Sequence, residues 1–91
     1  MRDYEFTAIF YADEEKATAG SDFVQKKFEE NGVEIVNRED MGVRQLAYLI
    51  KKQDKGHYCY YEIKAEPDRI AAMTGEFMLS GNLLKFLFVA K

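Results

Sequence analysis

His57 and Cys59 are the side chains in this sequence best suited to bind a metal ion or to act in nucleophilic catalysis. They stand two residues apart in a segment that favours a β-strand, so both point to the same face. A structural zinc site takes four ligands, and the chain has no second His or Cys. We therefore expect a strand-end His57 and a core Cys59, with no metal site, no catalytic residue and no cofactor.

The segment from Lys55 to Tyr61 joins a basic residue and a glycine to several aromatic residues. RNA-recognition motifs carry a related arrangement on their third strand, where exposed rings stack on bases. Tyr58 and Tyr60 would share one face of such a strand. The alternation of small and aromatic residues differs from that motif, so we interpret these tyrosines as strand formers with cross-strand neighbours.

Charge is distributed unevenly along the 91 residues, whose net charge is −3. Residues 1–40 hold 5 basic and 11 acidic side chains, giving −6, whereas residues 43–64 hold 5 and 2, giving +3. The acidic total argues against a free-standing, non-specific nucleic-acid binder. The single Cys excludes an internal disulfide, and no apolar run is long enough to cross a bilayer. We expect one cytoplasmic domain, residues 1–91, with no membrane partner.

Alternation and helical periodicity predict six elements in the order strand, helix, strand, strand, helix, strand. Asp13 is a favourable N-cap for the first helix, and Pro67 suits the first position of the second. Gly42 indicates a bulge in a long strand, and Asp54-Lys55-Gly56 indicates the turn of a hairpin. The predicted ranges are 3–11, 13–31, 33–52, 57–65, 67–80 and 83–90.

This order predicts an α+β, ferredoxin-like βαββαβ fold, with two helices packed on one face of a four-stranded antiparallel sheet. The opposite face would then be open to solvent. We expect it to expose six apolar or aromatic side chains, and patches of that kind usually mark an interaction site. They are Ile9, Tyr11, Tyr58, Tyr60, Leu87 and Val89.

Several short motifs resemble the bacterial small-subunit ribosomal protein six family, and the resemblance covers nearly the whole chain. The most distinctive of them is the run from Gly42 to Tyr48. The motifs are Met1-Arg2-x-Tyr4-Glu5, Gly42-Val43-Arg44-Gln45-Leu46-Ala47-Tyr48, Ile50-x-Lys52, Gly56-x-Tyr58 and Pro67-x-Arg69-Ile70.

The resemblance implies a structural role in the cytoplasmic ribosome, without catalysis, cofactor or small-molecule substrate. It implies binding to central-domain (platform) RNA of the small subunit, together with small-subunit ribosomal protein eighteen as heterodimer partner. We expect phosphate contacts from basic residues and partner contacts from the open sheet face. The RNA-binding candidates are Arg2, Arg44, Lys51 and Lys52, and the partner-binding candidates are Tyr58, Tyr60, Leu87 and Val89.

A second hypothesis belongs to another class of protein. Ferredoxin-like domains of this size also serve as small dimeric enzymes or ligand-binding domains, with the open sheet face lining a pocket. In that case His57, Tyr58 and Tyr60 would line the pocket.

Overall fold

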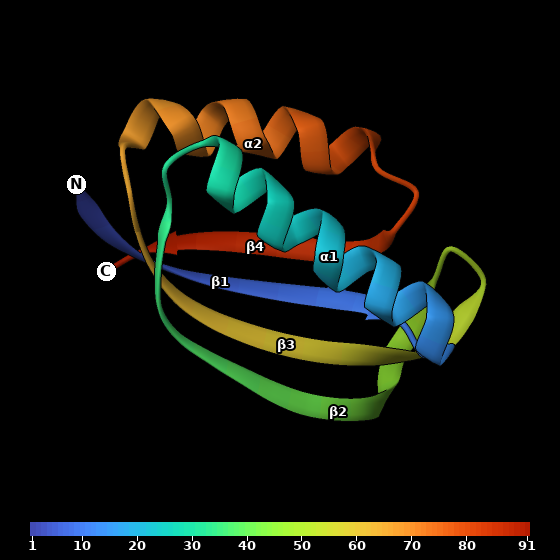
Figure 1. The fold of residues 1–91 in the computed structure, drawn as a ribbon. Helices are drawn as coiled ribbons and strands as arrows, with labels where there is room; N and C mark the ends of the chain where they lie inside the picture. Colours follow the sequence, from blue (N-terminus) through green and yellow to red (C-terminus); the bar gives the residue numbers. More distant parts are fainter.

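A computed structural model describes residues 1–91 as a sheet of four antiparallel strands with two helices on one face (Figure 1). The sheet order is β2-β3-β1-β4, so β1 and β3 are central, as predicted. The βαββαβ order of the ferredoxin-like fold is thereby confirmed. The elements are β1 (Arg2–Tyr11), α1 (Glu14–Glu30), β2 (Glu34–Ile50), β3 (Gln53–Ala65), α2 (Pro67–Leu79) and β4 (Leu83–Ala90).

Both helices begin where local chemistry predicts. The Asp13 side chain accepts a hydrogen bond from the backbone N–H of Lys16, which satisfies one of the free donors at the start of α1. α2 begins at Pro67, whose missing N–H costs nothing there. The buried stripe of α1 includes Gly20, where an added Cβ would lie 2.5 Å from a ring carbon of Phe10. The glycine therefore lets α1 approach the sheet.

Aromatic rings fill the space between the helices and the sheet. Phe6 of β1 lies at their centre, with its ring centroid 5.3 Å from Phe28 of α1 and 5.6 Å from Phe77 of α2. Tyr61 of β3 and Phe88 of β4 flank the same ring at 5.6 and 4.6 Å. One side chain of β1 thus joins both helices and both neighbouring strands.

The turn of the β2–β3 hairpin lies earlier than the sequence suggested. Lys51 and Lys52 form it, with φ angles of 49° and 66°, and Ile50 pairs with Gln53. These left-handed angles are typical of a two-residue turn whose twist matches the strands. The prediction of a turn at 54–56 was wrong because Gly56 serves packing instead: the Ile9 side chain occupies the place where its Cβ would lie.

The open face, the side of the sheet opposite the helices, is only partly uncovered. Ile9 is 8% exposed because Leu46 of the hairpin arm and Leu84 of β4 pack against it. Tyr11 and Tyr58 are half-buried beside this small cluster. The expectation that these three predicted residues are exposed was therefore wrong at this end of the sheet. The long arm of β2 folds over the face and shields them.

β2 is irregular, as its glycine suggested. Its register with β3 shifts at three places, and one lies between Asp40 and Gly42. Gly42 has φ +78°, a left-handed value that a side chain would oppose. This bulge confirms the prediction and bends the outer strand around the sheet.

Candidate functional site

Three of the four predicted partner-binding residues lie together on the open face. Thr7 of β1 pairs with Tyr60 on one side and with Leu87 on the other. Val89 follows two residues along β4 on the same face, and Leu87 and Val89 are 57% and 45% exposed. Tyr58 differs because it already packs beside the Ile9 cluster. The apolar strip over β4, β1 and β3 is thus exposed at Leu87 and Val89 and half-buried at Tyr60, so the expectation that Tyr60 is exposed was also wrong.

Acidic groups border this strip. Burial raises the pKa of Tyr60 to about 12, and the neighbouring carboxylates of Glu5 and Glu62 add to the rise. A phenol in that environment stays protonated and donates hydrogen bonds at neutral pH. Lys91 pairs with Glu62 at 3.5 Å. The open face therefore offers apolar contact bordered by carboxylates at Glu5 and Glu62 and by the exposed ammonium of Lys85, which lines the same hollow as Leu87.

A ligand pocket on the open face is not supported by the shape of the sheet. Its one hollow has a volume of about 180 Å³, below the roughly 300 Å³ at which small-molecule pockets begin. The alternative hypothesis also grouped residues that lie on opposite faces. His57 lines a cleft on the helix side, whereas Tyr58 and Tyr60 face away from the helices. Consecutive residues of a strand point in opposite directions, so His57 cannot join the two tyrosines.

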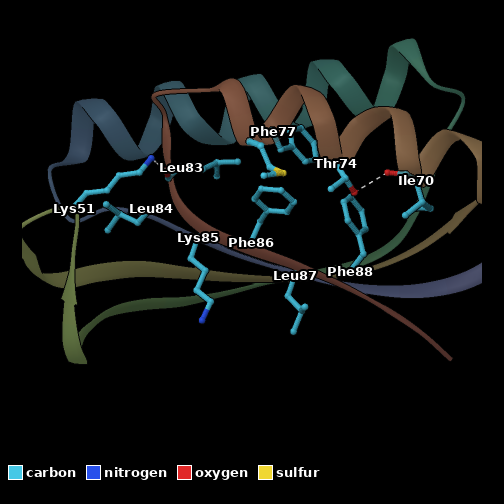
Figure 2. A pocket seen from close by; sticks show the side chains of 11 residues that line it. Lys51, Ile70, Thr74, Phe77, Leu83, Leu84, Lys85, Phe86, Leu87 and Phe88 are labelled. Carbon is cyan, nitrogen blue, oxygen red and sulfur yellow. Dashed lines mark hydrogen bonds between the residues drawn. The ribbon is translucent and has the colours of Figure 1, made fainter.

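A larger apolar groove, which the sequence did not predict, runs between α2 and β4 and includes the predicted site residues Lys51 and Leu87 in its lining (Figure 2). Its volume is about 610 Å³, and eight of its eleven lining residues are hydrophobic. Met78 lies on its lining, and the adjacent Leu79 is 89% exposed. These two apolar residues off the buried stripe of α2 were the available signal in the sequence. The outer edge of β4 beside the groove pairs with no other strand.

The predicted RNA-binding residues fall into three separate places. Lys51 and Lys52 form the turn of the β2–β3 hairpin, which we call the cationic tip. Arg44 lies further back along β2, where it pairs with Gly56 and its Nε donates to the backbone oxygen of Met41 at 3.3 Å. Lys51 also donates a hydrogen bond to the backbone oxygen of Leu83 at 2.8 Å, which ties the tip to the start of β4. Arg2 begins β1, so it lies at the opposite end of the sheet, roughly 30 Å away.

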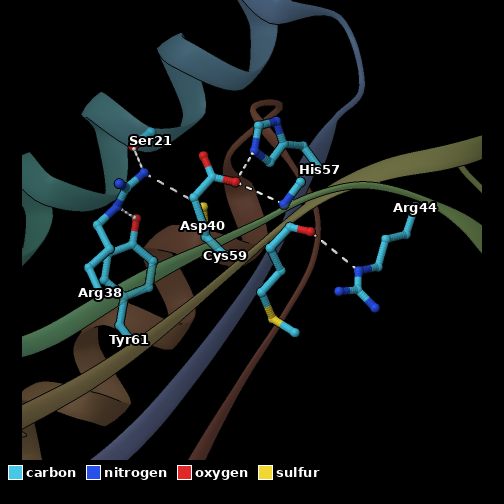
Figure 3. A network of polar contacts seen from close by, with 9 residues as sticks. Ser21, Arg38, Asp40, Arg44, His57, Cys59 and Tyr61 are labelled. Atoms are coloured by element: carbon cyan, nitrogen blue, oxygen red, sulfur yellow. Dashed lines mark hydrogen bonds and ion pairs between the residues drawn. The ribbon is translucent and has the colours of Figure 1, made fainter.

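A compact polar cluster occupies the helix side of β2 and β3 (Figure 3). The ring Nε2 of His57 lies 2.6 Å from Oδ1 of Asp40, and the backbone N–H of Gly42 donates to the same oxygen at 2.9 Å. These two hydrogen bonds lower the pKa of Asp40. Burial raises the pKa of Cys59, whose sulfur lies 3.6 Å from Nη2 of Arg38. Sequence reasoning missed Asp40 because it lies 17 residues before His57.

Comparisons with known proteins agree over almost the entire chain. The model of the family "Ribosomal protein S6" matches residues 3–90. The small ribosomal subunit protein bS6 of Treponema pallidum (strain Nichols) is 36% identical over 89 residues, covering 98% of this chain and 96% of that protein. The bS6 protein of Campylobacter curvus is also 36% identical over 91 residues, covering 98% of this chain and 64% of its own length.

Solved structures agree on the fold. The crystal structure of 30S ribosomal protein S6 from Thermotoga maritima superposes with a TM-score of 0.88 at 24% identity, covering 99% of this chain and 87% of that one. The C-terminal domain of MgtC from Mycobacterium tuberculosis shares the fold at a TM-score of 0.66 and 11% identity. Neither helix is long and apolar enough to span a membrane. The chain belongs to the ribosomal protein S6 family, structural proteins of the small ribosomal subunit in the cytoplasm rather than enzymes.

Proposed function

We propose that this chain binds central-domain (platform) RNA of the small ribosomal subunit as one half of a heterodimer with small-subunit ribosomal protein eighteen. The separation of its two surfaces supports this proposal most directly. Lys51 and Lys52 lie at the hairpin tip, while the apolar strip lies over β4, β1 and β3. An RNA and a protein can thus be bound at once without competing for one surface.

The cationic tip and Arg44 suit a phosphate backbone. Arg44 and Lys52 are exposed, and the turn projects Lys51 and Lys52 beyond the end of β1. Side chains of this kind position a protein on RNA without reading its sequence. Arg2 would make a separate contact at the far end of the sheet. A net charge of −3 leaves few cations, so tight RNA binding needs a second, basic protein.

The open face suits that second protein. Leu87 and Val89 offer exposed apolar area, and Tyr60 beside them keeps its hydroxyl proton. The carboxylate of Glu5 borders the strip, forms no salt bridge within the chain and complements a basic partner. The free edge of β2 adds a site where a partner segment can pair as a further strand.

The first test compares RNA affinity with and without the partner. We expect weak binding of the junction RNA by this chain alone and at least about tenfold tighter binding by the heterodimer, because the partner supplies positive charge. The measurement is a filter-binding or fluorescence titration at several salt concentrations. Equal affinity in both cases contradicts the proposal.

The second test separates the two surfaces. In the heterodimer, Arg44→Gln and Lys52→Gln should each lower the slope of log K against log salt by up to about 1 and leave dimer formation unchanged. Lys26→Gln, on the exposed side of α1, is the matched control and should have no effect. Leu87→Glu should weaken dimer formation instead. A Leu87→Glu variant that dimerises normally would remove the open face from the proposal.

A further inference from the structure

We propose that Asp40, His57 and Cys59 form a binding site for one zinc ion, independent of the ribosomal interactions proposed above. The three residues supply a carboxylate oxygen, an imidazole nitrogen and a sulfur, and these atoms all lie within 4.8 Å of one another. Ligands at 2.0–2.3 Å around a tetrahedral zinc ion stand roughly 3.3–3.8 Å apart. Small side-chain rotations therefore bring the three donors to one ion.

Strand register creates this grouping. His57 and Cys59 share the helix side of β3, and Asp40 of β2 pairs directly with Cys59 across the ladder. The register shift after Asp40 turns the backbone N–H of Gly42 back onto the carboxylate at 2.9 Å. Hydrogen bonds of this kind to a ligand hold it in the orientation that a metal requires.

The site is reached through a cleft between α1 and the strands β2 and β3. The cleft has a volume of about 440 Å³, and all three donor residues line it. Cys59 is 1% exposed and lies at its inner wall, whereas the side chain of Asp40 is 48% exposed. Three protein ligands with a solvent-filled space beside them leave the fourth zinc position to water. Glu14 and Asp22 also line the cleft and attract cations into it.

Arg38 is the one cation beside the site. Its Nη2 lies 3.6 Å from the Cys59 sulfur and 3.3 Å from Oγ of Ser21, and its Nε donates to the Tyr61 hydroxyl at 3.4 Å. These contacts hold the guanidinium to one side of the sulfur, where its charge offsets part of the burial that disfavours a thiolate. Zinc binding itself displaces the thiol proton. The carboxylate of Asp40 and the thiolate together balance the two charges of zinc. Sulfur and imidazole donors favour zinc over magnesium or calcium.

The test uses the full chain, since its only His and only Cys both lie in the site. Titration of metal-free protein with Zn²⁺ should show one ion per chain. Substitution by Co²⁺ should give the near-ultraviolet absorption of a cobalt–thiolate bond and the visible bands of tetrahedral cobalt. Mg²⁺ at the same concentration should not compete.

Single substitutions then identify the ligands. Cys59→Ala, His57→Gln and Asp40→Asn should each weaken Zn²⁺ binding by about tenfold or more, and Cys59→Ala should abolish the cobalt–thiolate absorption. Glu39→Gln is the matched control, an exposed carboxylate adjacent to Asp40 in sequence, and should bind as the native chain does. Circular dichroism verifies that each variant is folded. Absence of cobalt–thiolate absorption in the native chain at saturating metal, or unchanged Zn²⁺ affinity in folded Cys59→Ala, overturns the proposal.

Discussion

The two faces of the sheet use similar residues in different ways. On the helix side, Phe6 is fully buried and touches aromatic rings from both helices. On the open face, Leu87 sits one position away in the cross-strand register yet remains 57% exposed. The helix-side residues of these strands contribute most to stability, whereas the open face leaves side chains such as Leu87 in contact with solvent.

Phe6→Ala should give the largest loss of stability. Removal of this central ring leaves a cavity that neither helix can move to fill. We therefore expect the free energy of unfolding to fall by about 3–5 kcal/mol. Leu87→Ala on the open face should cost under about 1 kcal/mol, because its side chain already meets solvent. Urea unfolding of the two variants measures the difference. Similar losses of stability in Phe6→Ala and Leu87→Ala would show that the two faces of the sheet do not differ in their contribution to stability.

Ile9→Ala tests the part of the open face that the hairpin arm covers. Ile9 is buried against Leu46 and Leu84, so its truncation should cost about 2–4 kcal/mol. Val89→Ala, on the uncovered part of the same face, is the control and should cost far less. If Ile9→Ala is as mild as Val89→Ala, the hairpin arm does not cover the face in solution.

Each helix contains a glycine, and the two differ in their surroundings: Gly20 of α1 packs against the sheet, whereas Gly75 of α2 has open space around it. In Gly20→Ala the new Cβ would meet the Phe10 ring and the Asn82 backbone oxygen, so we expect a loss of about 1–3 kcal/mol despite better helix propensity. In Gly75→Ala the Cβ meets nothing within 4 Å, and the change should stabilise by about 0.5–1 kcal/mol. Thermal unfolding should move the two melting temperatures in opposite directions.

Tyr60 should show the smallest effect, in alkaline titration. Its folded pKa of about 12 is above the ordinary value of 10, so the neutral phenol favours the folded state. That contribution is complete below pH 10 and is lost as the pH rises toward 12. Absorbance of tyrosinate should reveal one late-titrating group that Tyr60→Phe removes. If Tyr60 titrates near pH 10, its burial and the neighbouring carboxylates do not act on it in solution as described.

Sequence periodicity was enough to predict helices and strands that depend only on local sequence. The stripe of α1, the cap at Asp13 and the strand of residues 83–90 all lie where the pattern placed them. The hairpin turn was misplaced because a glycine in a strand can indicate either of two things. It can mark a turn with positive φ, or a position where another side chain packs too closely for a Cβ. Gly56 is of the second kind, because the Ile9 side chain packs where its Cβ would lie, and the sequence alone does not show this contact.

Contacts between distant segments could not be predicted. The covering of Ile9 by Leu46 depends on how far β2 bends, which follows from three register shifts rather than from one glycine. The same β2–β3 register brings Asp40 next to His57. Because bulges shift this register, the number of residues between Asp40 and His57 does not predict their contact. The strand faces of the candidate residues were predictable from alternation, whereas the boundary between covered and exposed surface depends on this bending.

The bend at Lys51 and Lys52 has a consequence for how this protein can change. These are its only non-glycine residues with positive φ, where L-amino acids lose roughly 1–2 kcal/mol each. An Asn-Gly pair would relax the backbone at this bend, yet it would also remove two of the thirteen basic side chains. Replacement of this turn by Asn-Gly would therefore raise thermal stability and remove both positive charges from the hairpin tip. Stability and local positive charge thus place opposite demands on the same two residues.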